Sequence, residues 1–194
     1  MISVIKYNAG NIRSVAFALE RLGVEFAITD NPEEIRKADK VIFPGVGEAS
    51  TTMKYLKDTQ LDQVIRELKQ PVLGICLGMQ LMCAFSEENQ TTCLGIFDES
   101  VKLFKPTYNE KVPHMGWNSL TLTNSWLMNS LHEQFVYFVH SYYVPVNSYT
   151  SAITEYILPF SAAMKKDNFY AVQFHPEKSA EVGEKVLQSF LNIS

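Results

Sequence analysis

Residues 71–80, which read Pro-Val-Leu-Gly-Ile-Cys-Leu-Gly-Met-Gln, place one cysteine between two glycines where an apolar strand gives way to a helix. A residue at such a sharp turn takes up a strained backbone that small neighbours permit, and its side chain projects into a cleft. The helix beginning near Leu77 would direct its positive end at the sulfur and favour the thiolate. The pattern predicts a nucleophile at Cys76, although Gly74 and Gly78 could equally mark tight packing around a buried cysteine.

A second motif lies far downstream, where residues 170–179 read Tyr-Ala-Val-Gln-Phe-His-Pro-Glu-Lys-Ser. Proline fixes its own φ and keeps His175 extended, so the imidazole and the Glu177 carboxylate can project from one rigid corner. A thiol, an imidazole that titrates near neutrality and a carboxylate that orients it together perform nucleophilic catalysis. Glu177 could instead only serve the start of a helix at 180–191. With Cys76, the motif predicts a Cys76–His175–Glu177 triad.

The predicted elements alternate between short strands and amphipathic helices in the first half, as in an α/β sheet. The predicted strands are 2–6, 24–29, 40–43 and the segment leading to Cys76, with helices at 12–22, from 32, within 48–57 and 60–69, and at 78–86. The second half offers strands at 101–104, 119–122, 135–140, 151–155, 162–165 and 170–174 before the helix at 180–191. We therefore expect a mostly parallel open sheet flanked by helices, flavodoxin-like at its core, with antiparallel strands added in the C-terminal half. Cys83 is expected inside a core helix and Cys93 in a loop.

Several chemically useful residues follow the predicted strands at their carboxyl ends, where open α/β sheets collect their ligands. Gly47, Cys76, Ser141 and His175 all have this position and can converge in one cleft.

The segment Pro44-Gly-Val-Gly47 offers unencumbered backbone N–H groups near the thiol. We expect an oxyanion hole built from Gly45, Val46 and Gly47, with the Leu77 N–H as a further donor. A plain tight turn is the alternative. Because two glycines flank Val46, a flexible loop could also keep an enzyme silent until a partner aligns it.

The two motifs resemble those of class I glutamine amidotransferases, which have an α/β fold and a Cys–His–Glu triad. Four further segments, 7–15, 44–47, 113–118 and 137–143, make the chain similar over nearly its whole length to the glutaminase subunits of histidine biosynthesis. Two departures stand out: Asn8 replaces a usual glycine, and Glu48-Ala49 replaces the more usual Ala-Phe. Asparagine tolerates positive φ well, so we expect the first turn to survive.

The resemblance implies a single glutamine amidotransferase type-1 domain over residues 1–194, with glutamine as substrate and no cofactor or metal. Cys76 would attack the side-chain carboxamide of glutamine, and water would then release glutamate and leave ammonia as the second product. The resemblance also implies that Gly47, Gln80 and the backbone around Ser141 and Tyr142 bind the substrate. Gln80 as an ordinary helix-surface residue is the alternative.

The resemblance further implies a heterodimer in which ammonia passes through a channel to a cyclase subunit with a (β/α)8 barrel. That subunit makes imidazole glycerol phosphate and aminoimidazole carboxamide ribotide. The interface candidates are Asn11, Trp117, Tyr137 and Lys178. Aromatic residues often anchor interfaces, but Trp117 could also be a core aromatic and Lys178 a solvated helix-start residue.

The composition limits the remaining possibilities. A chain of 194 residues with 46% hydrophobic content and no linker-like stretch can form one sizeable core, and its net charge of −4 argues against sequence-independent nucleic-acid binding. No signal peptide or membrane-length apolar run is visible, and three cysteines suit a reducing compartment, so we expect a cytoplasmic protein. His114, His132 and His140 have spacings that fit no compact metal site.

Three other functions stay open. A related amidotransferase that supplies ammonia to another acceptor, such as a sugar precursor of surface polysaccharide, would keep every catalytic residue. A hydrolase or chaperone of similar sheet topology is the second alternative. Those proteins resemble one another in a histidine directly after the elbow cysteine, and Leu77 at that position disfavours this function here. A non-catalytic binding or regulatory subunit is disfavoured by the intact Cys76, His175 and Glu177.

Overall fold

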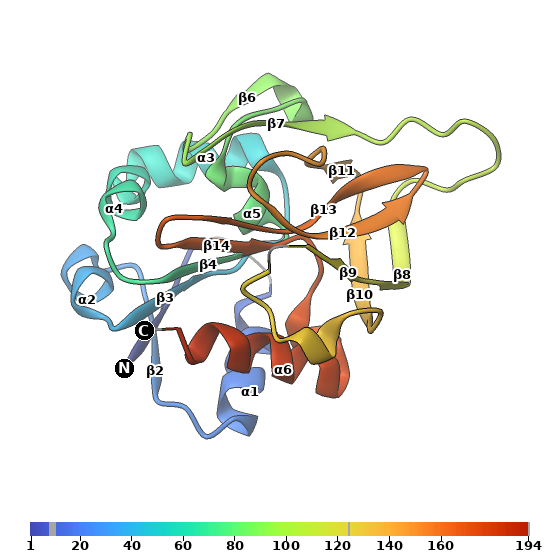
Figure 1. The fold of residues 1–194 in the computed structure, drawn as a ribbon. Helices are drawn as coiled ribbons and strands as arrows, with labels where there is room; N and C mark the ends of the chain where they lie inside the picture. Colours follow the sequence, from blue (N-terminus) through green and yellow to red (C-terminus); the bar gives the residue numbers. More distant parts are fainter. Residues whose placement is uncertain (8–10, 124, 194) are drawn as a thin grey trace.

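An eight-stranded sheet runs through the computed structural model of the chain, which describes residues 1–7, 11–123 and 125–193 (Figure 1). In spatial order its strands are β2 (Phe26–Thr29), β1 (Ile2–Ile5), β3 (Lys40–Phe43), β4 (Val72–Ile75), β14 (Phe169–Val172), β13 (Leu158–Lys166), β12 (Thr150–Tyr156) and β9 (Thr121–Leu122). The pairs from β2 to β14 are parallel, and those from β14 to β9 are antiparallel. The predicted mostly parallel sheet with antiparallel additions is confirmed.

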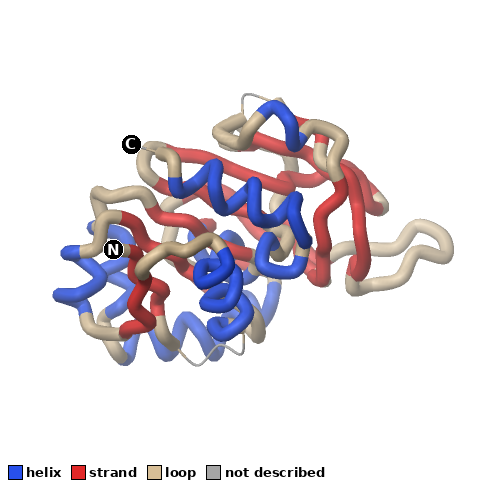
Figure 2. The backbone as a smooth tube through the Cα atoms, turned by 90° about the horizontal axis from the view of Figure 1, so that it is seen from below, coloured by secondary structure: helices blue, strands red, loops and turns tan. Residues whose placement is uncertain are grey.

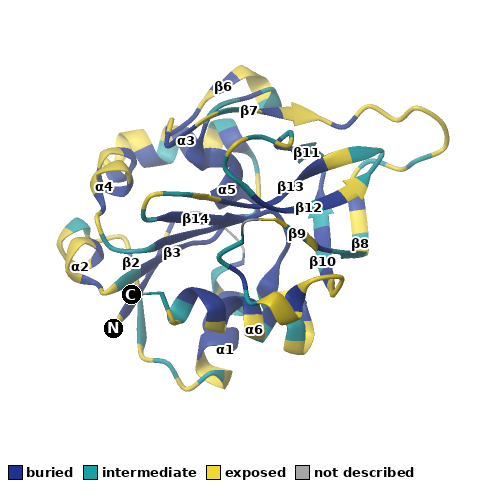
Figure 3. Cartoon of the chain, in the orientation of Figure 1, coloured by how far each residue is buried: buried dark blue, intermediate teal, exposed yellow. Residues whose placement is uncertain are grey.

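Helices cover both faces of this sheet, so the molecule has three layers. Helices α1 (Ile12–Arg21) and α6 (Ala180–Leu191) lie on one face, and α2 (Pro32–Lys37), α3 (Ala49–Asp58), α4 (Leu61–Glu67) and α5 (Leu77–Met82) lie on the other. Strand side chains alternate between the two faces, so Val41 and Phe43 enter the core beneath α2–α5 while Ile42 enters the core beneath α1 and α6. Figure 3 shows the resulting contrast between buried sheet and exposed outer helix faces.

Local sequence signals placed several of these elements. Asn31 accepts a hydrogen bond from the Glu33 N–H at 2.9 Å and so caps α2, directly before its first proline. Figure 2 shows α1 and α6 on the same side of the sheet. An ion pair links these two helices, with Arg21 Nε 3.0 Å from the Glu184 carboxylate. In the ranges that the structure describes, no helix is long and apolar enough to cross a membrane.

Two smaller sheets flank the carboxyl ends of the central strands. One contains β11 (Tyr142–Tyr143), β7 (Phe97–Leu103), β5 (Cys83–Ser86) and β6 (Thr91–Thr92), and the other pairs β8 (His114–Ser119) with β10 (Phe135–His140). Short 3-10 turns also occur: η1 (Glu88–Gln90), η2 (Asn129–Leu131) and η3 (Pro176–Lys178).

The predicted helix at 78–86 is wrong in its second half. Helix α5 ends at Met82, and Cys83 leaves the helical backbone to begin β5, which pairs with β6 and β7. Cys83 is therefore a buried strand residue and not part of a helix. A short apolar run fits helix and strand equally well, and here pairing with distant strands decides. The same long-range pairing creates β8, which the sequence analysis did not predict.

Candidate active site

The turn from β4 into α5 has the strained geometry that its sequence predicted. Cys76 adopts φ 52° and ψ −106°, a conformation that residues other than glycine avoid, and its N–H donates to the Val172 carbonyl at 2.8 Å. Gly78 permits the close approach of α5 to β3, because a Cβ there would lie 2.1 Å from the Phe43 carbonyl oxygen. The turn thus holds the thiol at the carboxyl end of β4, with only 7% of Cys76 exposed.

The corner after β14 holds the imidazole and the carboxylate together. His175 Nδ1 lies 2.7 Å from Glu177 Oε1, and both side chains are fully buried. Because Nδ1 carries the proton that Glu177 accepts, Nε2 of the neutral ring has a free lone pair, and among the described residues it has no hydrogen-bond partner. His175 can therefore take a proton from a group placed at Nε2.

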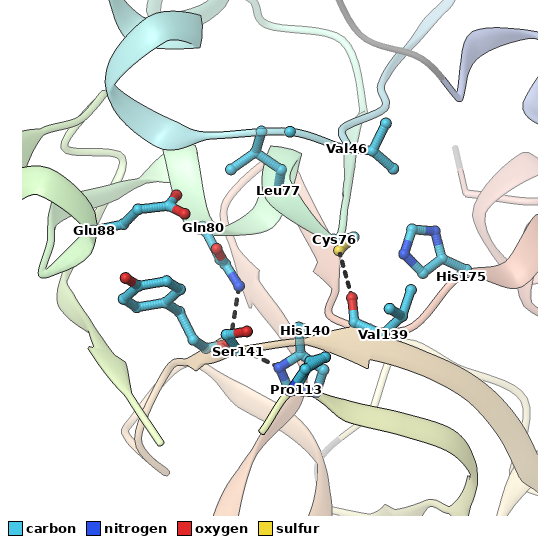
Figure 4. Close-up of a pocket in the computed structure, with 12 residues that line it drawn as sticks. Val46, Cys76, Leu77, Gln80, Glu88, Pro113, Val139, His140, Ser141 and His175 are labelled. Atoms are coloured by element: carbon cyan, nitrogen blue, oxygen red, sulfur yellow. Dashed lines mark hydrogen bonds between the residues drawn. The ribbon is translucent and has the colours of Figure 1, made fainter. Parts of the chain in front are cut away.

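The imidazole and the thiol lie on the same side of the cavity in Figure 4. Burial disfavours the charged imidazole, but once the thiol has given up its proton, the charge and hydrogen bond of Cys76 and the hydrogen-bonded Glu177 outweigh burial and raise the pKa of His175 to about 10. An imidazole with this environment readily keeps a proton taken from the thiol. The structure brings the three residues of the predicted triad together.

A cavity of about 340 Å³ opens in front of the thiol, large enough for an amino acid. Its lining includes all the predicted oxyanion and substrate-binding residues except Gly45, namely Val46, Gly47, Leu77, Gln80, Ser141 and Tyr142. The other lining residues are Cys76, Glu88, Pro113, Val139, His140 and His175. Gln80 is only 5% exposed, and its amide donates to the Tyr142 carbonyl at 3.0 Å. The alternative that placed Gln80 on a helix surface is therefore wrong.

The predicted oxyanion hole is not open in this conformation. The Leu77 N–H donates to the Gly45 carbonyl oxygen at 3.4 Å, so the loop itself occupies one of the expected donors. The neighbouring Pro44 carbonyl accepts a hydrogen bond from the Tyr7 hydroxyl, which is buried. Gly47 adopts φ 120°, which is easy only for glycine. Use of Leu77 as an oxyanion donor requires the Gly45 carbonyl to turn away.

Two residues of the site were missed by the sequence analysis. Glu88 lines the cavity and accepts a hydrogen bond from the Ala49 N–H at 2.7 Å, while burial raises the pKa of its carboxyl group. Gln173 is fully buried beside Cys76. A polar residue inside the apolar run 170–174 was a signal for Gln173, whereas no local pattern marked Glu88, which lies in η1 beyond the predicted helix.

The predicted interface residues have different surroundings. Trp117 is 53% exposed and packs edge-on against Tyr137, with ring centroids 6.0 Å apart, so the alternative of a buried core Trp117 is wrong. Lys178 is exposed. Asn11 is only 6% exposed, and its amide donates to Glu177 and lies 3.4 Å from His175 Nδ1. Within this chain, Asn11 therefore contacts the triad. An interface role for Asn11 stays a prediction.

The turn expected at Asn8 lies outside the described residues.

Two of the three remaining histidines form a buried pair behind the cavity. His140 Nδ1 donates to the Tyr142 carbonyl at 2.7 Å, so its Nε2 accepts from His114 Nδ1 at 3.0 Å. The third, His132, is half exposed elsewhere, and the described part of the chain contains no cluster of metal-ligating side chains. Burial lowers the pKa of His140 to about 3 and that of His114 to about 4, so both rings are neutral.

This pair should make the fold sensitive to acid. A histidine whose pKa falls below its unfolded value of about 6.5 stabilises the fold above that pH and loses the contribution as pH falls toward its folded pKa. From the folded pKa of about 3, His140 alone should cost about 2 kcal/mol of stability between pH 7 and pH 4.5. His140→Asn, whose side-chain NH₂ group can replace the Nδ1 donor to Tyr142, should reduce the pH dependence of the unfolding free energy by this amount in denaturant titrations. His132→Asn is the control, and an equal reduction in both variants would contradict the assignment.

The comparisons with known proteins agree with this geometry. The family model for Glutamine amidotransferase class-I matches residues 3–193. A Bacteroides fragilis protein named imidazole glycerol phosphate synthase subunit HisH is 63% identical over 194 residues, covering 99% of both chains. A Legionella pneumophila protein named imidazole glycerol phosphate synthase subunit HisH 2 is 47% identical over 195 residues, covering 100% of this chain and 98% of the relative.

Solved structures share the fold at much lower sequence identity. A crystal structure described as a glutamine amidotransferase has a TM-score of 0.74 at 18% identity, covering 98% of this chain and 97% of its own. The structure of PurLQS from Thermotoga maritima has a TM-score of 0.72 at 16% identity, with the same coverage. With the family match over nearly the whole length and the high identity to full-length relatives, the chain belongs to the class I glutamine amidotransferase family.

Proposed function

We propose that this chain is the glutaminase subunit of an imidazole glycerol phosphate synthase, which hydrolyses glutamine and delivers ammonia for histidine biosynthesis. The observation that carries the proposal is a cysteine in a strained turn at the floor of an amino-acid-sized cavity, beside a histidine whose Nε2 is free to accept a proton. The names of relatives at 62–63% identity support the specific pathway.

Glutamine would bind with its side-chain carboxamide at Cys76 and its α-groups at the far end of the cavity. There the Glu88 carboxylate can accept a charge-assisted hydrogen bond from the α-ammonium group. Gln80 and the backbone around Ser141 and Tyr142 complete this end of the cavity. Because both NH₂ contacts of Gln80 go to the protein, its carboxamide oxygen is the atom it offers to the ammonium.

The reaction follows from the positions of the three groups. His175 Nε2 takes the Cys76 proton, and the thiolate attacks the carboxamide carbon to form a tetrahedral oxyanion. The intermediate collapses as the imidazolium protonates the leaving nitrogen, which releases ammonia and leaves a γ-glutamyl thioester on Cys76. Water activated by His175 then hydrolyses the thioester to glutamate. Glu177, held by Asn11 and His175 Nδ1, keeps the imidazole in the tautomer that these steps need.

The loop 44–47 would act as a gate on this reaction. A trans peptide points its carbonyl and N–H in opposite directions, so turning the Gly45–Val46 peptide would release the Leu77 N–H and aim the Val46 N–H at the thiol. Each oxyanion donor is worth roughly 3 kcal/mol, so the closed loop would leave the free subunit nearly inactive. Tyr7 holds the Pro44 carbonyl and would confine the rotation to the following peptide.

The partner surface that we propose is the outer face of the β8–β10 ribbon. Alternate residues of paired strands share a face, and this one carries apolar side chains that are exposed or half-buried: Met115, Trp117, Phe135, Tyr137 and Val139. Exposed apolar patches of this kind are typical of protein interfaces. Tyr137 is also joined to the triad corner, since its carbonyl accepts from the His175 N–H at 2.9 Å and its N–H donates to Ser179 Oγ at 2.9 Å.

The proposed occupant of this face is the cyclase subunit, with a (β/α)8 barrel, in a heterodimer that channels ammonia. Docking on β10 would act directly on the strand that is hydrogen-bonded to His175.

Trp117→Ala should weaken cyclase binding by about 2 kcal/mol, or about 30-fold in Kd, because exposed aromatics at the centre of an interface carry much of its affinity. Titration calorimetry with the cyclase measures the change. Ile28→Ala, which truncates another exposed apolar side chain at the β2 edge of the sheet, is the matched control. Equal affinities for wild type and Trp117→Ala would place the interface elsewhere.

The test of the function is glutamate release from glutamine by the purified chain, alone and with the cyclase and its nucleotide ligand, with Cys76→Ala as the control. Turnover that appears only in the complex and is lost in the control supports the proposal. Turnover that ignores the cyclase would favour a glutaminase that serves another acceptor, and no turnover in any combination would favour a binding role. The single domain over residues 1–194 and the cytoplasmic location stay predictions.

A further inference from the structure

A buried glutamine touches the proposed nucleophile without lining the substrate cavity. Gln173 follows β14 and is 0% exposed. Its Nε2 donates to Cys76 Sγ at 3.6 Å, and its Oε1 accepts from Gln80 Nε2 at 2.9 Å. The catalytic steps described above assign no task to this side chain.

The orientation of the Gln173 amide is fixed by the Tyr142 carbonyl, a group that can accept a hydrogen bond but cannot donate one. The Tyr142 carbonyl can only accept, so the NH₂ group of Gln80 must face it. The other hydrogen of that NH₂ group then points at Gln173, which must present its oxygen. The NH₂ group of Gln173 is consequently left for the sulfur.

A second contact fixes the Tyr142 carbonyl, at which this series of hydrogen bonds ends. The Tyr142 carbonyl also accepts from the buried, neutral His140 at 2.7 Å, so two donors hold it in place. The protonated thiol of Cys76 faces a different acceptor, the Val139 carbonyl at 3.9 Å. Deprotonation removes the donor from that contact, and a thiolate facing a carbonyl oxygen is unfavourable. The Gln173 N–H is then a donor that the charged sulfur retains, in addition to the His175 imidazolium that has taken its proton.

We propose that Gln173 is a positioning residue, whose N–H, oriented through Gln80 by the Tyr142 carbonyl, holds Cys76 Sγ in place and stabilises its thiolate. The inference deepens the proposed function, since it takes Cys76 as the nucleophile. It also links the end of the cavity that would bind the α-groups to the sulfur, because Gln80 contacts both Tyr142 and Gln173. Hydrogen bonds to a charged acceptor favour the charged form and are stronger than bonds between neutral groups.

The experiment is the rate of Cys76 alkylation by iodoacetamide as a function of pH, followed by mass spectrometry of the Cys76 peptide in the full chain. Gln173→Glu retains the shape and the acceptor for Gln80 but places an oxygen against the sulfur. Gln173→Met removes both hydrogen bonds at similar volume. Gln63→Glu adds the same charge on the exposed face of α4 and is the matched control.

We expect the midpoint of the alkylation profile to move upward by about one pH unit in Gln173→Glu, which lowers the alkylation rate about tenfold at pH values well below the midpoint. Gln173→Met should move it in the same direction by less, and Gln63→Glu should leave it unchanged. A merely structural role would lower the melting temperature without moving the midpoint. Where Gln173→Glu fails to fold, the Gln173→Met profile decides.

Unchanged midpoints in the folded Gln173 variants would overturn the inference. The result is separate from that of the proposed function, because alkylation needs neither glutamine nor the cyclase. A shifted profile in a protein that never hydrolyses glutamine would sustain the role of Gln173 and refute the glutaminase. Glutamine hydrolysis by the complex, together with an unshifted alkylation profile, would sustain the glutaminase and refute the role of Gln173.

Discussion

Cys76→Ser is expected to lower glutamine hydrolysis by the complex by a factor on the order of 10⁵, as removal of a nucleophile does in other triad enzymes. A serine hydroxyl ionises far less readily than a thiol, and His175 owes its raised pKa partly to the negative charge at the sulfur. The serine variant therefore lacks both the nucleophile and the charge partner of the base. Single-turnover measurement of glutamate release separates this loss from a change in glutamine binding.

A second cysteine provides the control for this prediction. Cys93 is also buried, and burial raises its pKa to about 12, so its thiol stays protonated at neutral pH. Cys93→Ala should retain hydrolysis within a few-fold of the wild type. Substantial turnover in Cys76→Ser, or loss of turnover in a folded Cys93→Ala, would move the nucleophile away from Cys76.

The parts of the site that the sequence predicted are those with short-range causes. The strained turn at Cys76 depends on two glycines within two residues, and the His175–Glu177 corner depends on the proline between them. Helix α6 begins and ends at the predicted residues, 180 and 191. Convergence at one sheet edge could also be predicted, because the strands that precede these residues are parallel neighbours.

The rest of the site depends on contacts between distant segments, which no local pattern encodes. Asn11 and Glu177 lie 166 positions apart, and Gln173 and Cys76 lie 97 apart. Their side chains meet because the folded sheet brings these distant segments together. The boundary between α5 and β5 has the same origin, since Cys83 leaves the helix to pair with Phe97. Glu88 lies in η1, the turn between the paired strands β5 and β6, so its position also depends on this pairing.

The oxyanion loop illustrates a different limit. The glycines at 45 and 47 indicated a loop able to offer backbone donors, and that prediction concerned what the segment can do. The structure shows the Gly45 carbonyl on the Leu77 N–H instead. Glycine gives such a loop access to more than one peptide orientation, and a sequence pattern does not distinguish them.

Gly78→Ala is expected to lower glutamine hydrolysis by the complex about 100-fold and to destabilise the chain by about 1–3 kcal/mol. The added Cβ would lie 2.1 Å from the Phe43 carbonyl oxygen. Because both the Cβ and this oxygen are fixed to backbone, no side-chain rotation can relieve the clash. Relief requires α5 and the end of β3 to separate by about 1 Å, which is enough to misplace reacting groups. Because β3 leads into the loop 44–47, this separation moves the oxyanion donors away from Cys76.

Leu81→Met, a volume-conserving change at a buried position of the same helix, is the control and should cost less than about 1.5 kcal/mol with little loss of turnover. Denaturant unfolding and glutamate release measured on the same preparations separate the two effects. If Gly78→Ala lowered stability but left glutamate release unchanged, the separation of α5 from β3 would not reach the active site, and the prediction would be wrong. Because Gly78 directly follows Leu77, whose N–H lies against the loop, the structure predicts that stability and turnover fall together.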